Sequence, residues 1–238
     1  MSENILGKIN SFCSLGTVDG PGIRFVVFMQ GCPLRCGCCH NPETWDINGG
    51  NLYSPDQVFE RVCKYTDYFG EKGGITLSGG EPLLQAKFVS KLFTLCKNKG
   101  INTCLDTSGC IMNEEVKSAL KLTDRVLLDV KYTDKESYQK YVGCDYNKVL
   151  EFLDYLQKEN IKTTLRQVII PSLNDNEENI LRLKQLKNHY SVVDQVELLP
   201  FKKICKSKYE NLNIPFRFEN LSEPTQELMQ KFKKIIND

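Results

Sequence analysis

The sequence lacks an excess of charge of either sign, a long apolar run, and a basic leader followed by an apolar stretch. It holds 31 basic and 30 acidic residues among 238, and its net charge of +1 gives no sign of a nucleic-acid partner. No apolar run approaches the length of a membrane-spanning helix, which is about 20 residues, and residues 1–5 do not resemble a signal peptide. We therefore expect a cytoplasmic protein that binds neither nucleic acid nor membrane.

Cysteine, in contrast, is abundant, with 11 residues. The odd number argues against a fully paired disulfide framework, and so many thiols would suit a pathway that works without oxygen. Cys32, Cys36 and Cys39 form a C-x3-C-x2-C pattern directly after the apolar run 23–30. Such a run, closed by glycine, is typical of a buried strand that leads into a loop. The cysteines therefore lie in a loop, 31–40, just past the carboxyl end of a predicted strand.

Thiolates crowded this closely repel one another unless a cation compensates their charge, so the pattern indicates a soft metal centre. An iron–sulfur cluster fits best. Structural zinc, the main alternative, usually takes two separated pairs of ligands, and the chain has no second C-x2-C pair. A ferredoxin cluster takes four cysteines, whereas three would leave one iron of a four-iron cluster open to another molecule. Inert buried cysteines are a further alternative, and Cys38 is a possible substitute ligand that the spacing disfavours.

The rest of the chain alternates apolar strand patterns with helical ones. Strands are predicted over 23–30, 73–78, 101–105, 125–128, 163–170 and 192–199, and helices over 55–68, 85–99, 113–122, 148–160, 177–189 and 225–236. Six such units predict parallel strands with right-handed crossovers. We expect an α/β fold that forms one domain over 1–238, a partial (β/α)6 barrel completed by residues 203–238. An open doubly wound sheet is the alternative.

The candidate site residues outside the cysteine loop also follow the carboxyl ends of predicted strands. They are the Gly79-Gly80-Glu81-Pro82 stretch, Asp106, Asp129-Val130-Lys131 and Lys202. In a barrel these strand ends form one rim, where active sites are built. Two of the charged groups have simpler explanations: Asp129 and Lys131 could form a surface ion pair of little energetic value. Arg166, in the middle of an apolar strand, needs an anionic partner unless it lies at an exposed edge.

The C-x3-C-x2-C motif, together with Gly16–Arg24 and His40–Trp45, resembles the pyruvate formate-lyase activating enzymes of the radical S-adenosylmethionine (SAM) superfamily. The resemblance extends from Gly16 to about residue 230. It implies a 4Fe-4S cluster on Cys32, Cys36 and Cys39 whose fourth iron chelates the amino and carboxylate groups of SAM. One electron from the cluster then cleaves SAM to methionine and a 5'-deoxyadenosyl radical, which takes a hydrogen atom from one glycine of the partner enzyme.

The same resemblance implies roles for the other candidates. Lys131 would pair with the SAM carboxylate or a nearby acid, Asp129 would orient it, and the three cluster cysteines with Lys131 would carry catalysis. The residues expected to bind cofactor are Cys38, Cys39, His40, Gly80, Glu81, Asp129, Val130, Lys131 and Arg166. Two positions depart from the family pattern. Cys38 replaces an aromatic residue that lies near the adenine, and Lys202 replaces a histidine that contacts SAM.

The resemblance finally implies the partners. They are a glycyl-radical enzyme of the pyruvate formate-lyase type, which the loop Gly16–Gly22 with Asp19 would face, and an electron donor such as reduced flavodoxin. The protein itself would be a monomer. An activase of a different glycyl-radical enzyme, a small-molecule radical SAM enzyme and a non-catalytic iron–sulfur or zinc protein are the alternatives. The absence of an inserted ferredoxin-like domain favours the pyruvate formate-lyase type, and an electron carrier would need a fourth ligand.

Overall fold

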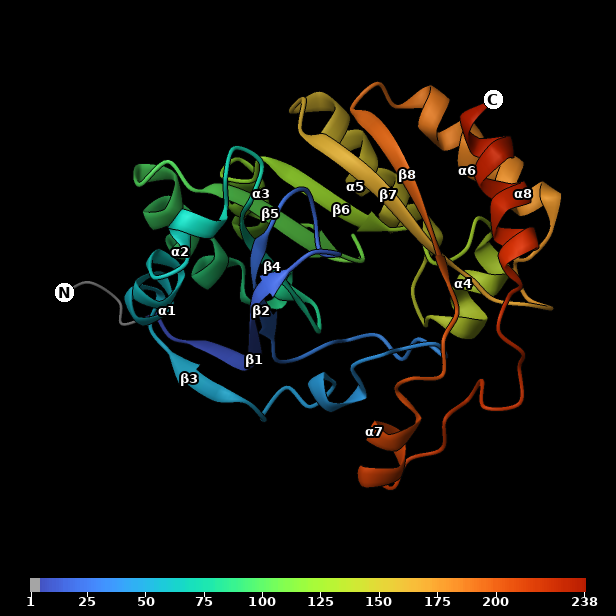
Figure 1. Ribbon diagram of the computed structural model, residues 1–238, viewed down its shortest axis with the longest axis horizontal. Coiled ribbons are helices and arrows are strands. Elements are labelled where there is room, and N and C mark those ends of the chain that lie inside the picture. Colours follow the sequence, from blue (N-terminus) through green and yellow to red (C-terminus); the bar gives the residue numbers. More distant parts are fainter. Residues whose placement is uncertain (1–4) are drawn as a thin grey trace. The chain divides into compact units, whose positions relative to one another are not determined.

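The computed structural model describes residues 5–238, which form an α/β fold (Figure 1). Its strands follow the order β3-β1-β2-β4-β5-β6-β7-β8 in one mostly parallel sheet, whose two end strands differ, so the sheet does not close. This confirms the predicted fold class. The chain divides into two compact units. The first contains residues up to 33 together with 44–107 and 111–127, and the second contains 34–43, 108–110 and 128–238.

The first unit is built around parallel strands whose side chains are buried on both faces. β2 pairs in parallel with β4, and β4 with β5, while β1 pairs antiparallel with both β2 and β3. Helix α2 contacts α1, α3 and β5. The elements are β1 (Gly7–Gly16), β2 (Arg24–Met29), β3 (Asn51–Tyr53), α1 (Pro55–Cys63), β4 (Gly74–Gly79), α2 (Ala86–Asn98), β5 (Asn102–Thr107) and α3 (Glu114–Leu120), with short 3-10 turns at Pro42–Thr44, Thr66–Tyr68 and Pro82–Gln85.

The second unit holds the remaining elements, and β6 (Arg125–Asp129) begins in the first unit and ends in the second. β7 and β8 pair in parallel, and α6 and α8 pack on each other and on β8 (Figure 1). The elements are α4 (Lys135–Tyr141), α5 (Tyr146–Lys158), β7 (Lys162–Ile169), α6 (Glu177–His189), β8 (Val193–Pro200), α7 (Lys206–Asn211) and α8 (Gln226–Asn237). None of the helices within 5–238 is long and apolar enough to cross a membrane.

Two predicted helix starts are confirmed in atomic detail. Ser54 and Gln57 form a capping box, in which the Gln57 amide donates to Ser54 Oγ (3.2 Å) and the Ser54 amide donates to Gln57 Oε1 (2.8 Å). Pro55 occupies the first turn, where its missing amide proton has no cost. At α3 the side chain of Asn113 accepts from the Val116 amide at 2.9 Å. Local side-chain chemistry therefore fixes where these helices begin.

The prediction of only six strands is wrong, because it missed β1 and β3. It also missed the short helices α4 and α7. β1 contains Gly, Ser and Asn among few large apolar residues, and much of it is half-exposed. Its stability comes from pairing along β2, which is a tertiary contact that no local pattern reveals.

Arg24 anchors the start of β2, directly after the glycine-rich loop Gly16–Gly22. This side chain is fully buried. Its Nε donates to Thr76 Oγ1 and its Nη1 donates to Asn102 Oδ1, both at 2.9 Å. The Thr76 hydroxyl in turn donates to the backbone carbonyl of Asp19 at 2.7 Å. A buried guanidinium with several acceptors therefore ties the loop to β4 and β5.

Candidate active site

In the first unit, the glycine-rich turn after β4 is hydrogen-bonded to the residue that precedes Cys32. The amide of Glu81 donates to the carbonyl of Gly31 at 2.8 Å, and the amide of Gly80 donates to that of Met29 at 2.9 Å. A Cβ on Gly80 would come within 2.2 Å of the Gly31 oxygen, so only glycine allows this approach. The two turns that the sequence singled out after β2 and β4 are therefore fixed to each other through the backbone.

The side chain of Glu81 is buried and forms hydrogen bonds within the protein. Its Oε1 accepts from the Thr107 hydroxyl at 2.7 Å and from the Leu83 amide at 3.1 Å. Thr107 ends β5, and Asp106 beside it accepts from the Ser78 hydroxyl at 2.6 Å. The carboxylate of Glu81 thus joins the ends of β4 and β5.

In the second unit, Asp129 lies between two cations. Its Oδ2 pairs with Lys131 Nζ, and its Oδ1 lies 3.3 Å from Arg166 Nε. The side chains of Asp129 and Lys131 are each 20% exposed and that of Arg166 is 13% exposed. Arg166 is therefore not at an exposed edge, and its anionic partner is Asp129. Two cations sharing one carboxylate leave one positive charge, which is suited to a carboxylate ligand.

The charged states of this group follow from its neighbours. Burial alone would raise the pKa of Asp129, but Lys131 and then Arg166 hold it below its ordinary value. Burial alone would lower the pKa of Lys131, but Asp129, followed by Cys36 and Cys38, raises it well above its ordinary value. Asp129 and Lys131 therefore stay charged at neutral pH, and the Lys131 ammonium lies within electrostatic reach of the cysteine loop.

The backbone that carries Asp129 and Lys131 is held by residues outside the predicted site. The amide of Lys131 donates to the Tyr138 hydroxyl at 3.1 Å, and this hydroxyl donates to the Asp129 carbonyl at 3.4 Å. The amide of Val130 donates to the Arg166 carbonyl at 2.9 Å. No sequence pattern pointed to Tyr138, because it lies on the short helix α4, which was not predicted.

The second unit also contains most of the cysteine loop. Cys36, Cys38 and Cys39 are half-buried. The amide of Gly37 between them donates to the Tyr141 carbonyl at 3.1 Å, and a Cβ on Gly37 would lie 2.3 Å from the ring of Phe218. Burial raises the pKa of Cys38 to about 11. Backbone hydrogen bonds and an aromatic ring therefore shape the loop.

The C-terminal part of the loop is held by the segment Lys202–Asn211, which contains α7 and which we call the α7 segment. The Tyr209 hydroxyl donates to the Cys39 carbonyl at 3.1 Å, and Lys208 Nζ donates to Asn41 Oδ1 at 2.9 Å and to Glu43 Oε1 at 2.6 Å. These contacts were not predicted, because 160 or more residues separate the partners along the chain.

His40 and Lys202, two residues singled out in the sequence, contact each other. Nε2 of His40 donates to the backbone carbonyl of Lys202 at 3.0 Å, and burial lowers the pKa of His40. The side chain of Lys202 lies elsewhere, since its Nζ pairs with Glu223 at 2.7 Å. The backbone carbonyl of Lys202 therefore holds His40 of the cysteine loop, while its side-chain ammonium pairs with the Glu223 carboxylate.

The donor set fits an iron–sulfur cluster better than a single metal ion. Within residues 5–238, no three His, Cys, Asp or Glu side chains converge on one metal position. An iron–sulfur cluster does not need such convergence, because each cysteine binds a different iron and the cysteine sulfurs lie further apart than around a single metal ion. Cys32, Cys36 and Cys39 are all half-buried, and sulfur is the ligand that iron–sulfur clusters take. The residues present therefore fit the group that the sequence predicts.

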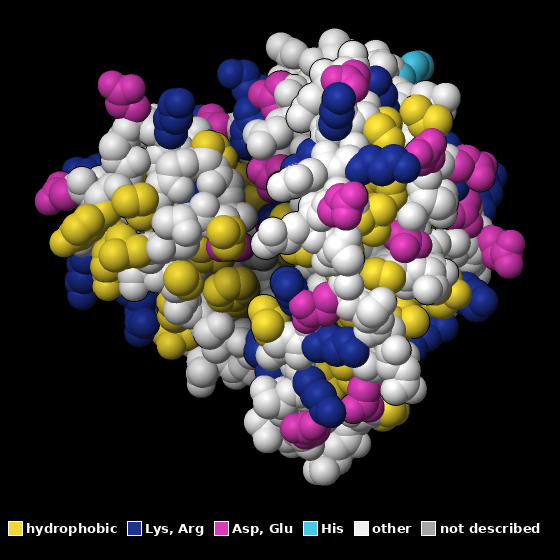
Figure 2. Space-filling model, turned by 45° about the vertical axis from the view of Figure 1, so that its right-hand side comes forward, with side chains coloured by type: hydrophobic (Ala, Val, Ile, Leu, Met, Phe, Trp, Pro, Cys, Tyr) yellow, Lys and Arg dark blue, Asp and Glu magenta, His cyan; other side chains and the backbone are white. Residues whose placement is uncertain are grey.

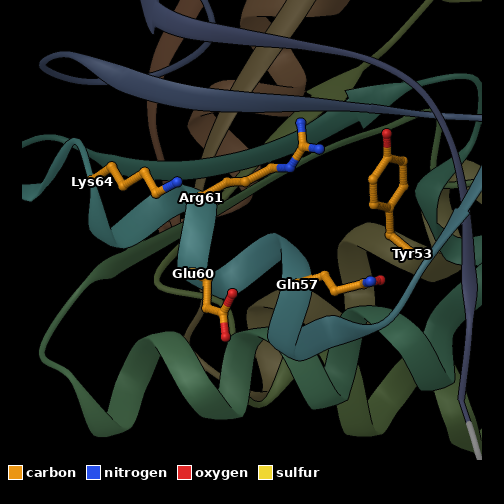
Figure 3. A pocket seen from close by; sticks show the side chains of 5 residues that line it. All are labelled: Tyr53, Gln57, Glu60, Arg61 and Lys64. Carbon is orange, nitrogen blue, oxygen red and sulfur yellow. The ribbon is translucent and has the colours of Figure 1, made fainter.

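A surface hollow on α1 and β3 is lined by none of the predicted site residues. It has a volume of about 220 Å³ and is lined by Tyr53, Gln57, Glu60, Arg61 and Lys64 (Figure 3). The guanidinium of Arg61 lies 5.0 Å from the centre of the Tyr53 ring, a cation–π contact.

On the face shown in Figure 2, basic and acidic side chains are interspersed, with apolar side chains between them.

Comparison with known proteins places these features in a family. Residues 26–183 match the radical SAM superfamily. The chain is 38% identical over 236 residues to the pyruvate formate-lyase 1-activating enzyme of Escherichia coli, covering 98% of this chain and 96% of that one. It is 38% identical over 235 residues to the pyruvate formate-lyase-activating enzyme of Clostridium pasteurianum, covering 98% of both chains.

Solved structures agree at the level of the fold. A domain of a pyruvate-formate lyase-activating enzyme from Bacteroides vulgatus superposes with a TM-score of 0.58 at 22% identity, covering 70% of this chain and 94% of that one. Streptococcus suis SuiB bound to S-adenosylmethionine superposes with a TM-score of 0.69 at 13% identity, covering 87% and 44%. From its sequence relatives, this chain belongs to the pyruvate formate-lyase activating enzyme family of the radical SAM superfamily.

Proposed function

We propose that this protein is a glycyl-radical enzyme activase that uses SAM and a 4Fe-4S cluster to install a radical on a partner of the pyruvate formate-lyase type. The family supports this, because the named relatives match over nearly their whole length. The structural observation that carries the proposal is the cationic group of Lys131 and Arg166, held by Asp129, within electrostatic reach of the Cys36 and Cys38 thiols. It offers a carboxylate-binding group beside a cysteine loop.

Cys32, Cys36 and Cys39 would hold the cluster. The bound cluster would supply the one electron that divides SAM into methionine and a 5'-deoxyadenosyl radical, and this radical would become 5'-deoxyadenosine by taking one hydrogen atom from the partner's glycine. The protein's own part is to bind and orient SAM and to exclude water from it. Catalysis would therefore rest on these three cysteines and on Lys131.

The remaining predicted residues would orient SAM. Lys131 and Arg166 would bind its carboxylate, while Asp129 keeps both cations in place, as their ion pairs support. The backbone of Gly80 and Glu81 would receive the amino group, because the Glu81 carboxylate is already engaged by Thr107. The backbone at Cys38, Cys39, His40 and Val130 would complete the cofactor-binding set.

We further propose that the protein is a monomer formed as one radical SAM domain over 1–238, in which residues 203–238 complete the partial barrel. It would be located in the cytoplasm and be reduced by a donor such as reduced flavodoxin. The loop Gly16–Gly22 would face the partner enzyme. Its anchoring through Arg24 supports a loop of defined shape rather than a plain connector.

The test is anaerobic. The protein is reconstituted with iron and sulfide, reduced and mixed with SAM, and 5'-deoxyadenosine is measured with and without pyruvate formate-lyase, whose glycyl radical is followed by EPR. We expect product together with a radical on the lyase, and neither with Cys36→Ala. Product without a radical on the lyase would favour a small-molecule substrate or another glycyl-radical enzyme. Absence of both product and cluster would overturn the proposal.

A further inference from the structure

Tyr132 follows Lys131 and carries a buried hydroxyl group. The residue is 2% exposed, and its hydroxyl has no hydrogen-bond partner within the described chain, residues 5–238. Native proteins rarely leave a buried polar group unpaired, since such a group loses its hydrogen bonds to water without replacement. An exception of this kind points to a partner that is bound to the protein in its working state.

The ring of Tyr132 is fixed by aromatic neighbours on α4. Its centre lies 5.4 Å from that of Tyr141, at an interplanar angle of 32°, and 6.5 Å from that of Tyr138, at 81°. Tyr141 also accepts the backbone hydrogen bond of Gly37 in the cysteine loop. A ring packed in this way cannot turn freely to reach another acceptor. Through Tyr141 it is connected to the cysteine loop.

Two cysteines of the loop are among the groups that act electrostatically on this hydroxyl, together with Tyr141 and Arg217. Burial is the largest cause that raises the pKa of Tyr132, and the Cys38 and Cys36 thiols come next. The sulfurs are therefore within electrostatic reach. A tyrosine hydroxyl keeps its proton at neutral pH even without such effects, so it can act as a donor.

We propose that the Tyr132 hydroxyl donates a hydrogen bond to an inorganic sulfide of the cluster held at loop 31–40. The inference rests on the proposed function, because this acceptor is present only when the cluster is bound. A hydrogen bond to a sulfur stabilises the more negative, reduced cluster and raises its midpoint potential. Tyr132 would thus make the cluster easier to reduce.

The experiment compares Tyr132→Phe with Tyr190→Phe, a matched control in the same unit. Tyr190 is also buried, but its hydroxyl already donates to Asp154 at 2.8 Å. The thermal midpoint of each iron-free protein is measured first. We expect an equal or higher midpoint for Tyr132→Phe, which removes an unpaired hydroxyl, and a lower one for Tyr190→Phe, which breaks a hydrogen bond.

The iron-loaded proteins are then titrated anaerobically, with EPR detection of the reduced cluster. We expect full iron content in both variants, a more negative midpoint potential for Tyr132→Phe and an unchanged one for Tyr190→Phe. A potential of Tyr132→Phe equal to wild type, or a lower thermal midpoint of its iron-free form, would overturn the inference. Failure of the wild-type protein itself to assemble a cluster would instead overturn the proposed function.

Discussion

At the scale of single residues, spacing distinguishes the cysteines of the loop. Cys32, Cys36 and Cys39 have the C-x3-C-x2-C spacing, whereas Cys38, between Cys36 and Cys39, lies outside it. We therefore predict that Cys36→Ala abolishes cluster assembly and that Cys38→Ala leaves it largely intact.

Iron content and visible absorption of the two reconstituted variants, compared with wild type, check this prediction. Cys63→Ala is a suitable control, because Cys63 is a half-buried free thiol on α1, outside the loop. Equal loss of iron in Cys36→Ala and Cys38→Ala would mean that the three ligands were wrongly chosen.

Asp129 is a residue of the second unit whose removal should lower stability. In Asp129→Asn the two cations Lys131 and Arg166 lose their shared counter-charge while remaining mostly buried. Breaking a buried ion pair from one side typically costs about 3–5 kcal/mol, and the partial exposure here favours the lower value. We expect the iron-free variant to lose about 3 kcal/mol in free energy of unfolding at pH 7, measured by urea denaturation. Unchanged stability would show that the ion pairs contribute little.

The same carboxylate predicts a pH dependence. Because Lys131 and Arg166 hold the pKa of Asp129 below its unfolded value of about 3.9, its stabilising effect is complete above that pH. The effect is lost as the pH falls through the lower, folded pKa. The difference between wild type and Asp129→Asn should therefore be constant from pH 7 to about 5 and shrink below about pH 4. A difference that grows on acidification would contradict this sign.

At the scale of elements, sequence patterns found those elements that local chemistry specifies. The apolar run of β2 and the caps Ser54 and Asn113 gave strand and helix positions that the structure confirms. β1, α4 and α7 were missed, because each is short or polar and is stabilised by contacts with distant parts of the chain.

The candidate site divides in the same way. Asp129, Lys131 and Arg166 stood out because they are charged residues at or within apolar strands, and the structure brings them together. Tyr138 and Tyr209 carry no such signal. Their hydroxyls contact Lys131 and Cys39 only once α4 and α7 are packed in the fold. A tyrosine in a polar stretch of sequence does not by itself indicate such a contact.

The α7 segment offers a prediction at this scale. Lys208→Met removes the contacts to Asn41 and Glu43, and Tyr209→Phe removes the hydrogen bond to the Cys39 carbonyl. Each lost hydrogen bond should cost about 1 kcal/mol and loosen the end of the cysteine loop. We expect the iron-loaded variants to release iron to a chelator several-fold faster than wild type, followed anaerobically by the loss of visible absorption.

Lys206→Met is the matched control on the same helix, because Lys206 pairs with Glu219 at 2.8 Å and Glu210 at 3.8 Å on the exposed side. Its iron release should equal that of wild type. Equal acceleration in Lys206→Met and Lys208→Met would attribute the effect to the helix as a whole rather than to its contacts with the loop.

At the scale of the whole molecule, the proposed function requires that SAM binding depend on the cluster. The open iron would receive the amino and carboxylate groups, and Lys131 with Arg166 would add charge pairing. A ligand that binds only the folded protein at 100 times its dissociation constant stabilises it by about 2.7 kcal/mol. For a chain of 238 residues this is a rise in thermal midpoint of about 5–10 °C.

We therefore predict that SAM raises the thermal midpoint of the iron-loaded protein by this amount and leaves the iron-free protein nearly unchanged. Iron-loaded Cys38→Ala should respond like wild type, while Asp129→Asn should respond less, because its cations are no longer held in place for the SAM carboxylate. Anaerobic thermal unfolding at several SAM concentrations checks both statements. An equal shift with and without iron would mean that the protein's side chains bind SAM by themselves, and the cluster would then have no part in holding it.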